Sequence, residues 1–235
     1  MRIDRAIASE DWVASTLENQ GLTQGQYKGI LLAATTRDHV IAWQGVTGAG
    51  KSYALNQFRR IAEAQGYTVQ GFAPSAEAAK SLGDSAQIQQ TETVAALLCA
   101  QPQETPSQFP EIWVVDEAGL LSAKDALALL TKAQEQEARV ILVGDTWQLS
   151  AVEAGNPFKS LQQAGMATAY LNHSLRQKHQ QIKAGVDLIA EGKMAEGIDQ
   201  LKPYIHQFSG EEARAQAIAR DYLALTLEER RKTLL

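Results

Sequence analysis

The sequence predicts an α/β protein with a mostly parallel central sheet, flanked by helices and preceded by a short helical segment. Three observations support this fold class. Short apolar runs alternate along the chain with stretches of helical length, which is the order of βαβ units. Runs such as residues 112–115 and 140–143 are apolar throughout, as expected of strands covered on both faces. The 235 residues, 45% of them hydrophobic, are enough for one large domain or two small ones.

The expected elements are bounded by local signals. Gly21 breaks the first helical pattern, and Thr23 is placed to cap a second helix. Pro102, Pro106 and Pro110 mark an irregular loop. The expected strands are residues 39–44, 67–73, 112–115, 140–143, 167–171 and 204–208. The expected helices are residues 3–18, 24–35, 51–65, 75–82, 93–100, 123–137, 157–164 and most of the chain from 180 onward.

Composition excludes several classes of protein. The apolar content excludes a disordered chain, and the single cysteine, Cys99, excludes a disulfide scaffold. Cys99 lies in an apolar run, so we expect it to be buried. No run approaches the roughly 18 apolar residues of a membrane span, so no membrane insertion is expected. Residues 1–10 lack the apolar core of a signal peptide, which makes the reducing cytoplasm the expected compartment.

The net charge of −5, from 22 basic and 27 acidic residues, argues at first against a general nucleic-acid binder, because such proteins are usually basic. The acidic excess is local, however. Residues 61–136 contain 10 acidic and 3 basic side chains, whereas residues 1–60 contain 5 and 7. The charge of the whole chain therefore says little about any one face.

Residues 45–52, GVTGAGKS, match the phosphate-binding pattern G-x-x-x-x-G-K-[ST] between an expected strand and an expected helix. The glycines let the backbone curl so that N–H groups point at phosphate oxygens, and the helix start adds its positive end. Lys51 would neutralise the β- and γ-phosphates, and the Ser52 hydroxyl would bind Mg²⁺. The alternative is a chance glycine turn, which the flanking elements disfavour. The residues expected to hold ATP here are Gly45, Thr47, Gly48, Ala49, Gly50, Lys51, Ser52 and Tyr53.

Two carboxylates follow the apolar run at residues 112–115. Strand ends of this kind lie beside the phosphate loop in a parallel sheet. Asp116 would hold Mg²⁺ through water, and Glu117 would polarise the attacking water. Taken alone, the pair is equally well explained as a solvated strand end. The phosphate loop upstream favours the role in binding Mg²⁺ and water.

The segment 143–149, VGDTWQL, ends the next expected strand. A glutamine at this point, Gln148, is able to hydrogen-bond a γ-phosphate and a neighbouring loop, and so to report the nucleotide state to another site. The residues alone favour a simpler explanation, a tight turn built from Gly144 and Asp145. Trp147 is expected to be a partly buried loop aromatic, with stacking on a DNA base as the alternative.

In this order, the phosphate loop, the DEAG segment at 116–119 and the GDTWQL segment at 144–149 resemble the first motor domain of RecD-like superfamily 1 helicases. The resemblance implies a RecA-like P-loop NTPase fold. Gln26, in LTQGQ, resembles the adenine-reading glutamine of that branch. Arg176, in LNHSLRQ, resembles its arginine motif and implies a γ-phosphate contact. The catalytic residues implied by the whole set are Lys51, Glu117, Gln148 and Arg176.

The same resemblance points to single-stranded DNA. Residues 71–75, GFAPS, with Ala78, resemble the strand-contacting motif of the branch, which implies DNA contacts at Pro74 and Ser75. Thr91 and Thr93 are further candidates for contacts with DNA phosphates, and helix capping explains them equally well.

Residues 152–166, 176–178 and 217–225 narrow the resemblance to the helicase part of conjugative relaxases (TraI/TrwC-like). This implies an ATP-dependent, 5′-to-3′ DNA helicase or translocase that uses Mg²⁺ and moves on single-stranded DNA during plasmid transfer. The expected division is an N-terminal helical segment (1–37), a first motor domain (38–178) and a helical extension (179–235).

Two features of the family are not recognised in the sequence. Nothing after Arg176 supplies the motifs of a second motor domain, and the four histidines lie too far apart for a nicking site. We therefore expect a second motor domain and a relaxase domain in the parent protein, and poor activity of the isolated chain. The alternatives are a non-enzymatic nucleotide- or DNA-binding module, a module recognised by the conjugative secretion machinery, and a RecD-like recombination helicase subunit.

Overall fold

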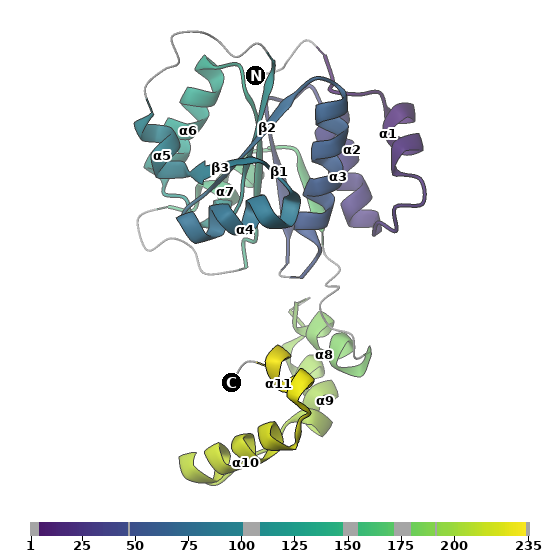
Figure 1. The fold of residues 1–235 in the computed structure, drawn as a ribbon, viewed down its shortest axis with the longest axis vertical. Helices are drawn as coiled ribbons and strands as arrows, with labels where there is room; N and C mark the ends of the chain where they lie inside the picture. The colour runs from purple at the N-terminus through teal and green to yellow at the C-terminus, as the bar shows by residue number, and fades with distance from the viewer. Residues whose placement is uncertain are drawn as a thin grey trace. The chain divides into compact units, whose positions relative to one another are not determined.

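The computed structural model describes residues 5–46, 48–100, 109–147, 155–171, 180–190 and 192–233. The chain divides into two compact units, residues 1–176 and 177–235. The first unit contains the sheet and every predicted site residue, and its ribbon is shown in Figure 1. The split near residue 176 does not test the three-part division expected from the sequence, which stays a prediction.

The first unit is built on a six-stranded sheet with the order β3-β2-β4-β5-β1-β6. All five strand pairings are parallel, so the carboxyl ends of the strands lie along one edge. This confirms the predicted α/β, RecA-like fold class. The strands are β1 (Val40–Gly45), β2 (Thr68–Ala73), β3 (Gln90–Thr93), β4 (Glu111–Val115), β5 (Arg139–Gly144) and β6 (Thr168–Leu171).

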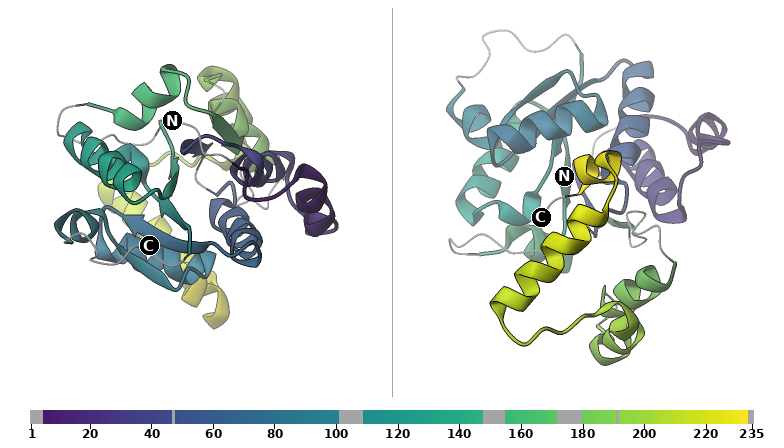
Figure 2. Two further views of the ribbon diagram at one scale, coloured as in Figure 1. Left: turned by 90° about the horizontal axis from the view of Figure 1, so that it is seen from above. Right: turned by 60° about the horizontal axis from the view of Figure 1, so that its bottom comes forward.

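Helices cover both faces of this sheet, as Figures 1 and 2 show. Most begin at a Ser, Thr or Asn whose side chain accepts a hydrogen bond from the first turn, as at Thr23 and Ser122. The helices of this unit are α1 (Glu10–Leu17), α2 (Gln24–Thr35), α3 (Lys51–Ala64), α4 (Ala76–Ala86), α5 (Val94–Cys99), α6 (Ala123–Glu135) and α7 (Pro157–Gln163).

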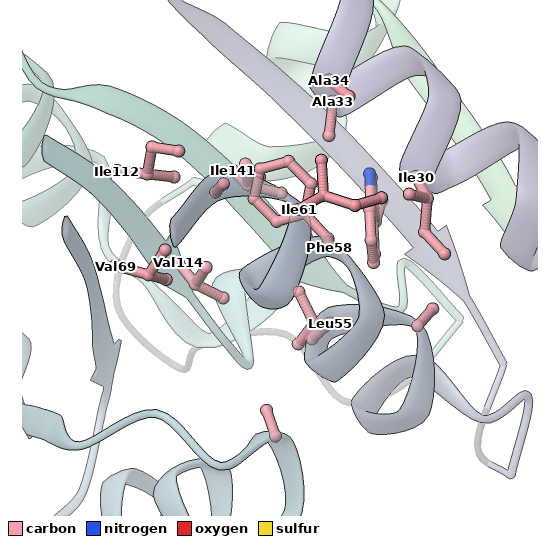
Figure 3. Close-up of a cluster of buried hydrophobic side chains, with 14 of the residues drawn as sticks. Ile30, Ala33, Ala34, Leu55, Phe58, Ile61, Val69, Ile112, Val114 and Ile141 are labelled. Carbon is pink, nitrogen blue, oxygen red and sulfur yellow. The ribbon is translucent and has the colours of Figure 1, made fainter. Parts of the chain in front are cut away.

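The core is two-sided because successive strand residues point to opposite faces. Ile112 and Val114 of β4 pack with helices α2 and α3 in one cluster, drawn in Figure 3. Trp113 and Val115 of the same strand pack with α5, α6 and α7 in the other. Both faces of β4 are therefore covered by side chains, and its residues 112–115 are apolar throughout, as expected. The N-terminal helices α1 and α2 share the first cluster, so they are part of the same core as the sheet.

The structure differs from the expected elements at three places. The first helix begins at Glu10, after its cap Ser9, and the described residues before it are not helical. Residues 90–93, which carried no strand signal, form the edge strand β3. Residues 204–208 form no strand: a short 3₁₀ turn, Lys202–Tyr204, precedes an irregular stretch. Cys99, expected to be buried, is exposed at the end of α5.

The second unit, taken by itself, is helical where it is described. Helices α8 and α9 pack against each other, and α10 and α11 follow. Among the described residues, no helix has the length and apolarity needed to cross a membrane. The elements are α8 (Gln180–Ala190), α9 (Met194–Leu201), α10 (Glu211–Ala224) and α11 (Leu227–Lys232).

Candidate nucleotide-binding site

The sheet brings three of the predicted motifs to one edge. The phosphate loop follows the carboxyl end of β1, the two carboxylates follow β4, and the turn at 145–147 follows β5. These strands are neighbours in the order β4-β5-β1. Gln44 pairs with Gly144, and Val115 pairs with Leu142, so the three strands end close to the same level. A site at this edge is the usual arrangement in open parallel sheets.

The phosphate loop has the backbone that its glycines were expected to supply. Gly48 and Gly50 have φ values of +82° and +72°, a region that disfavours residues with a side chain. Gly50 caps helix α3, which begins at Lys51, so the unpaired N–H groups of the first helical turn face the loop. The Lys51 ammonium donates to the Gly45 carbonyl oxygen at 2.6 Å and lies over the loop. The arrangement suits a phosphate ligand. Thr47 lies outside the described residues.

Asp116 and Glu117 follow β4 and have unusual surroundings. The Asp116 N–H donates to the Phe72 carbonyl at 2.8 Å, and its carboxylate accepts from the Glu117 N–H at 2.9 Å. Burial raises the pKa of Asp116, against the lowering effects of that hydrogen bond and of the Lys51 charge. Partial burial, and next the charge of Asp116, raise the pKa of Glu117.

Glu117 is held in the left-handed backbone region, with φ at +52°. Such a conformation costs about 1 kcal/mol or more in a residue with a side chain, and it is found where the surroundings fix it. Here the chain turns directly into a short 3₁₀ helix, Ala118–Leu120, that lies against the end of β5. A Cβ atom on Gly144 would come within 3.2 Å of the Gly119 nitrogen. The absence of a side chain at Gly144 therefore lets the two turns meet.

The donor set fits Mg²⁺. Magnesium prefers oxygen ligands and is commonly held by one or two carboxylates together with substrate phosphates and water. Asp116 supplies a carboxylate, and Ser52, in the first turn of α3, supplies a hydroxyl. Within the described ranges, no group of three or more His, Cys, Asp or Glu side chains is placed to form a larger metal cage. These residues would hold the ion between loop and strand.

Gln26 and Tyr53 tie the N-terminal segment to the phosphate loop. Gln26 is 1% exposed, and its side-chain amide donates to the carbonyls of Ala49, at 3.0 Å, and Gly50, at 3.3 Å. Its oxygen accepts from the Thr23 N–H at 2.9 Å. The Tyr53 hydroxyl, on α3, donates to the Gln20 carbonyl at 2.7 Å. Gln26 and Tyr53, both predicted to bind nucleotide, thus lie beside the phosphate loop. The side chain of Gln26 is hydrogen-bonded to the backbone of that loop.

A residue missed in the sequence, Gln44, holds the turn after β5. Its side chain is 5% exposed and bonds Asp145 and Thr146, which follow β5. In the sequence Gln44 is a single glutamine within an otherwise apolar strand. It belongs to no motif, so nothing marked it as a site residue. Trp147, on the same turn, is 82% exposed, so the expectation of partial burial is wrong. Gln148 and Arg176, predicted to contact the γ-phosphate, lie outside the described residues.

The four candidate DNA-contacting residues lie on or next to β2 and β3. Pro74 and Ser75 are exposed after β2, and the Ser75 hydroxyl caps α4. Thr93 caps α5 by accepting from the Ala96 N–H at 3.0 Å, as the capping alternative expected. Thr91 is not a cap: it lies on β3, where its side chain fits against Gly71 and Gly83. Their contact with DNA stays a prediction.

Comparison with known proteins gives matches over most of the chain. The AAA domain family model matches residues 21–207. The conjugal transfer protein TraA of Rhizobium radiobacter is 29% identical over 182 residues, which is 77% of this chain and 16% of that protein. The ATP-dependent RecD2 DNA helicase of Deinococcus radiodurans is 33% identical over 163 residues, 66% of this chain and 22% of that protein. The multifunctional conjugation protein TraI of Escherichia coli is 27% identical over 196 residues, 77% of this chain and 11% of that protein.

Among solved structures, the Pif1 helicase of Candida albicans has the same fold. It superposes with a TM-score of 0.51 at 14% identity, over 81% of this chain and 49% of that one. The chain thus spans only 11 to 22% of the length of the curated relatives described above. The chain therefore belongs to the AAA domain family, and its sequence is similar to the RecD2 helicase and to the conjugation proteins TraA and TraI.

Proposed function

We propose that this chain is the first motor domain of an ATP-dependent, 5′-to-3′ DNA helicase or translocase that acts in plasmid transfer. The observation that supports this most is the meeting of three motifs at one sheet edge: the phosphate loop, the carboxylates after β4 and the turn after β5. The similarity to TraA and TraI supports a role in conjugation. The relatives are several times longer, so a second motor domain and a relaxase domain belong to the proposed parent protein.

The proposed chemistry is the hydrolysis of ATP. The N–H groups of the phosphate loop and the Lys51 ammonium bind the β- and γ-phosphates, and Ser52 and Asp116 hold Mg²⁺. Mg²⁺ held by these residues would neutralise charge that develops on the phosphate oxygens. Glu117 orients the attacking water and accepts its proton, for which its carboxylate must be ionised. Gln148 and Arg176 contact the γ-phosphate in this proposal.

Hydrolysis would be coupled to DNA through the neighbouring strand ends. Pro74 and Ser75 follow β2, which pairs with β4, the strand that carries Asp116 and Glu117. In a two-domain motor, nucleotide binding closes the cleft between domains and hydrolysis reopens it, which moves the pair along the strand. In this proposal Trp147, which is 82% exposed, stacks on a base of the single strand, because stacking needs a free aromatic face.

The test is ATP turnover with and without oligo(dT), measured by release of labelled phosphate. We expect slow turnover by the chain alone, stimulation by the DNA, and a loss of about 100-fold or more in Glu117→Gln with Mg-ATP binding retained. Glu111→Gln, at the other end of the same strand, is the matched control and should behave as wild type. Equal turnover in Glu117→Gln and wild type would refute the assignment.

The RecD2 match favours a second candidate, a RecD-like helicase with no part in conjugation. Both candidates share the same motor residues, so the ATPase test does not separate them. Fusion of this domain to a DNA-nicking domain in the parent protein would support the conjugative role. A parent that lacks such a domain would favour the RecD-like role.

A further inference from the structure

Gln44 is a buried polar side chain near the carboxyl end of β1. It lies on β1, where Ile41, Ala42 and Trp43 before it are buried and apolar. A buried carboxamide costs free energy unless its donors and acceptor find partners. Gln44 finds three: its nitrogen donates to the Asp145 carboxylate at 3.1 Å, and its oxygen accepts from the Thr146 N–H at 3.2 Å. The side chain of Gln162, on α7, also donates to that oxygen, at 3.4 Å.

These hydrogen bonds connect the strand that leads into the phosphate loop with the turn at 145–147. The backbone pairing of β1 with β5 reaches Gln44 and Gly144, and the Gln44 side chain continues the connection into the turn beyond. The next residue on β1, Gly45, begins the phosphate loop. The same Asp145 oxygen that accepts from Gln44 also accepts from the Trp147 N–H at 3.0 Å, so one carboxylate orders the turn at 145–147.

The turn is also in contact with the segment that carries Glu117. A Cβ atom on Gly119 would come within 3.4 Å of the Asp145 carbonyl oxygen. A displacement of the 145–147 turn would therefore change the space available to the backbone behind Glu117. Packed elements of this kind move between discrete arrangements and do not deform gradually.

We propose that Gln44 is a positioning residue that fixes the 145–147 turn relative to the phosphate loop and so makes nucleotide affinity depend on the γ-phosphate. This rests on the proposed function, in which Gln148, directly after the turn, contacts that phosphate. ADP lacks the γ-phosphate, so in this proposal its binding does not depend on the ordered turn. A merely structural role for Gln44 would affect ADP and ATP analogues equally.

The test uses the full 235-residue chain and two measurements. The first is hydrogen exchange of the Thr146 and Trp147 amides by NMR, without nucleotide. The second is the dissociation constant of Mg-ADP and of Mg-ATPγS by calorimetry. The main variant is Gln44→Met, which keeps an unbranched side chain of similar length and removes all three hydrogen bonds. Gln57→Met is the matched control, because Gln57 is a buried glutamine on α3 that bonds Arg60 and not the turn.

In Gln44→Met we expect exchange at Thr146 to be about tenfold faster, ATPγS binding to be about tenfold weaker and ADP binding to stay within about twofold. Gln57→Met should change neither measurement. Gln162→Leu, which removes only the longest of the three bonds, should weaken ATPγS binding by about threefold and keeps the test valid if Gln44→Met does not fold.

Two results would overturn the inference: unchanged exchange at Thr146 in Gln44→Met, or equal weakening of ADP and ATPγS. A wild-type chain that binds neither nucleotide would instead contradict the proposed function. In that case, the exchange measurement still decides whether Gln44 holds the turn.

Discussion

Glu117 shows how much of this site is set by single residues. Its position after a buried strand was enough to predict a carboxylate beside the phosphate loop. Its left-handed backbone, with φ at +52°, could not be predicted, because it depends on the packing of the following turn against Gly144. Because a left-handed residue leaves the extended conformation, Asp116 and Glu117 do not have to follow the alternation of side chains along a strand.

His39 gives the chain a predictable response to acid. It is buried at the start of β1, next to the buried Arg139. Burial first, and with it the charge of Arg139, lowers the pKa of His39 below 6.5. The unfolded chain therefore takes up a proton at a higher pH than the folded chain does, and stability falls as the pH drops below 6.5.

The measurement is thermal unfolding between pH 7.5 and pH 5.5. We expect the melting temperature to fall over this range in both proteins. The fall should be about 2 °C larger in wild type than in His39→Phe. His206→Phe, which changes an exposed histidine, is the control and should follow wild type. A His39→Phe variant with the same pH dependence as wild type would show that His39 is protonated equally in both states.

The elements that could be predicted from the sequence are those marked by a run of hydrophobic residues. Strands β1, β4 and β5 are short apolar runs between breaking residues, and their order along the chain was enough to place the two loops of the site. The edge strand β3, QTET, is polar and only partly buried, so no periodicity marked it. Residues 204–208 contain enough apolar side chains to suggest a strand, but no partner strand pairs with them among the described residues.

Gln26 is the residue through which helix α2 contacts the phosphate loop. The resemblance implies that this glutamine reads adenine, yet its amide donates to the carbonyls of Ala49 and Gly50. We therefore expect Gln26→Ala to weaken Mg-ATP and Mg-GTP binding by the same factor, about fivefold, because it loosens the loop that holds their common phosphates. Calorimetric titration with both nucleotides checks this. Loss of affinity for ATP alone would instead establish adenine reading.

Charge and size limit what the whole molecule does alone. Its net charge is −5, and its acidic excess lies within residues 61–136, which include Asp116 and Glu117. This acidic excess opposes contact with DNA phosphates, so we expect the chain alone to bind single strands weakly. The curated relatives described above are about three or more times longer, and in the proposed motor their further domains supply the remaining contacts. The central claim for this chain is therefore the nucleotide site.

The most direct test of that claim is calorimetric titration of the 235-residue chain with Mg-ATP, beside Lys51→Ala. We expect wild type to bind one Mg-ATP and Lys51→Ala to bind it about tenfold or more weakly, because the ammonium that neutralises the phosphates is lost. Lys132→Ala, which removes a lysine bonded to the carbonyls of Leu97 and Ala100, should leave the affinity unchanged. No binding by wild type, or equal affinity in Lys51→Ala, would show that residues 45–52 are not the nucleotide site.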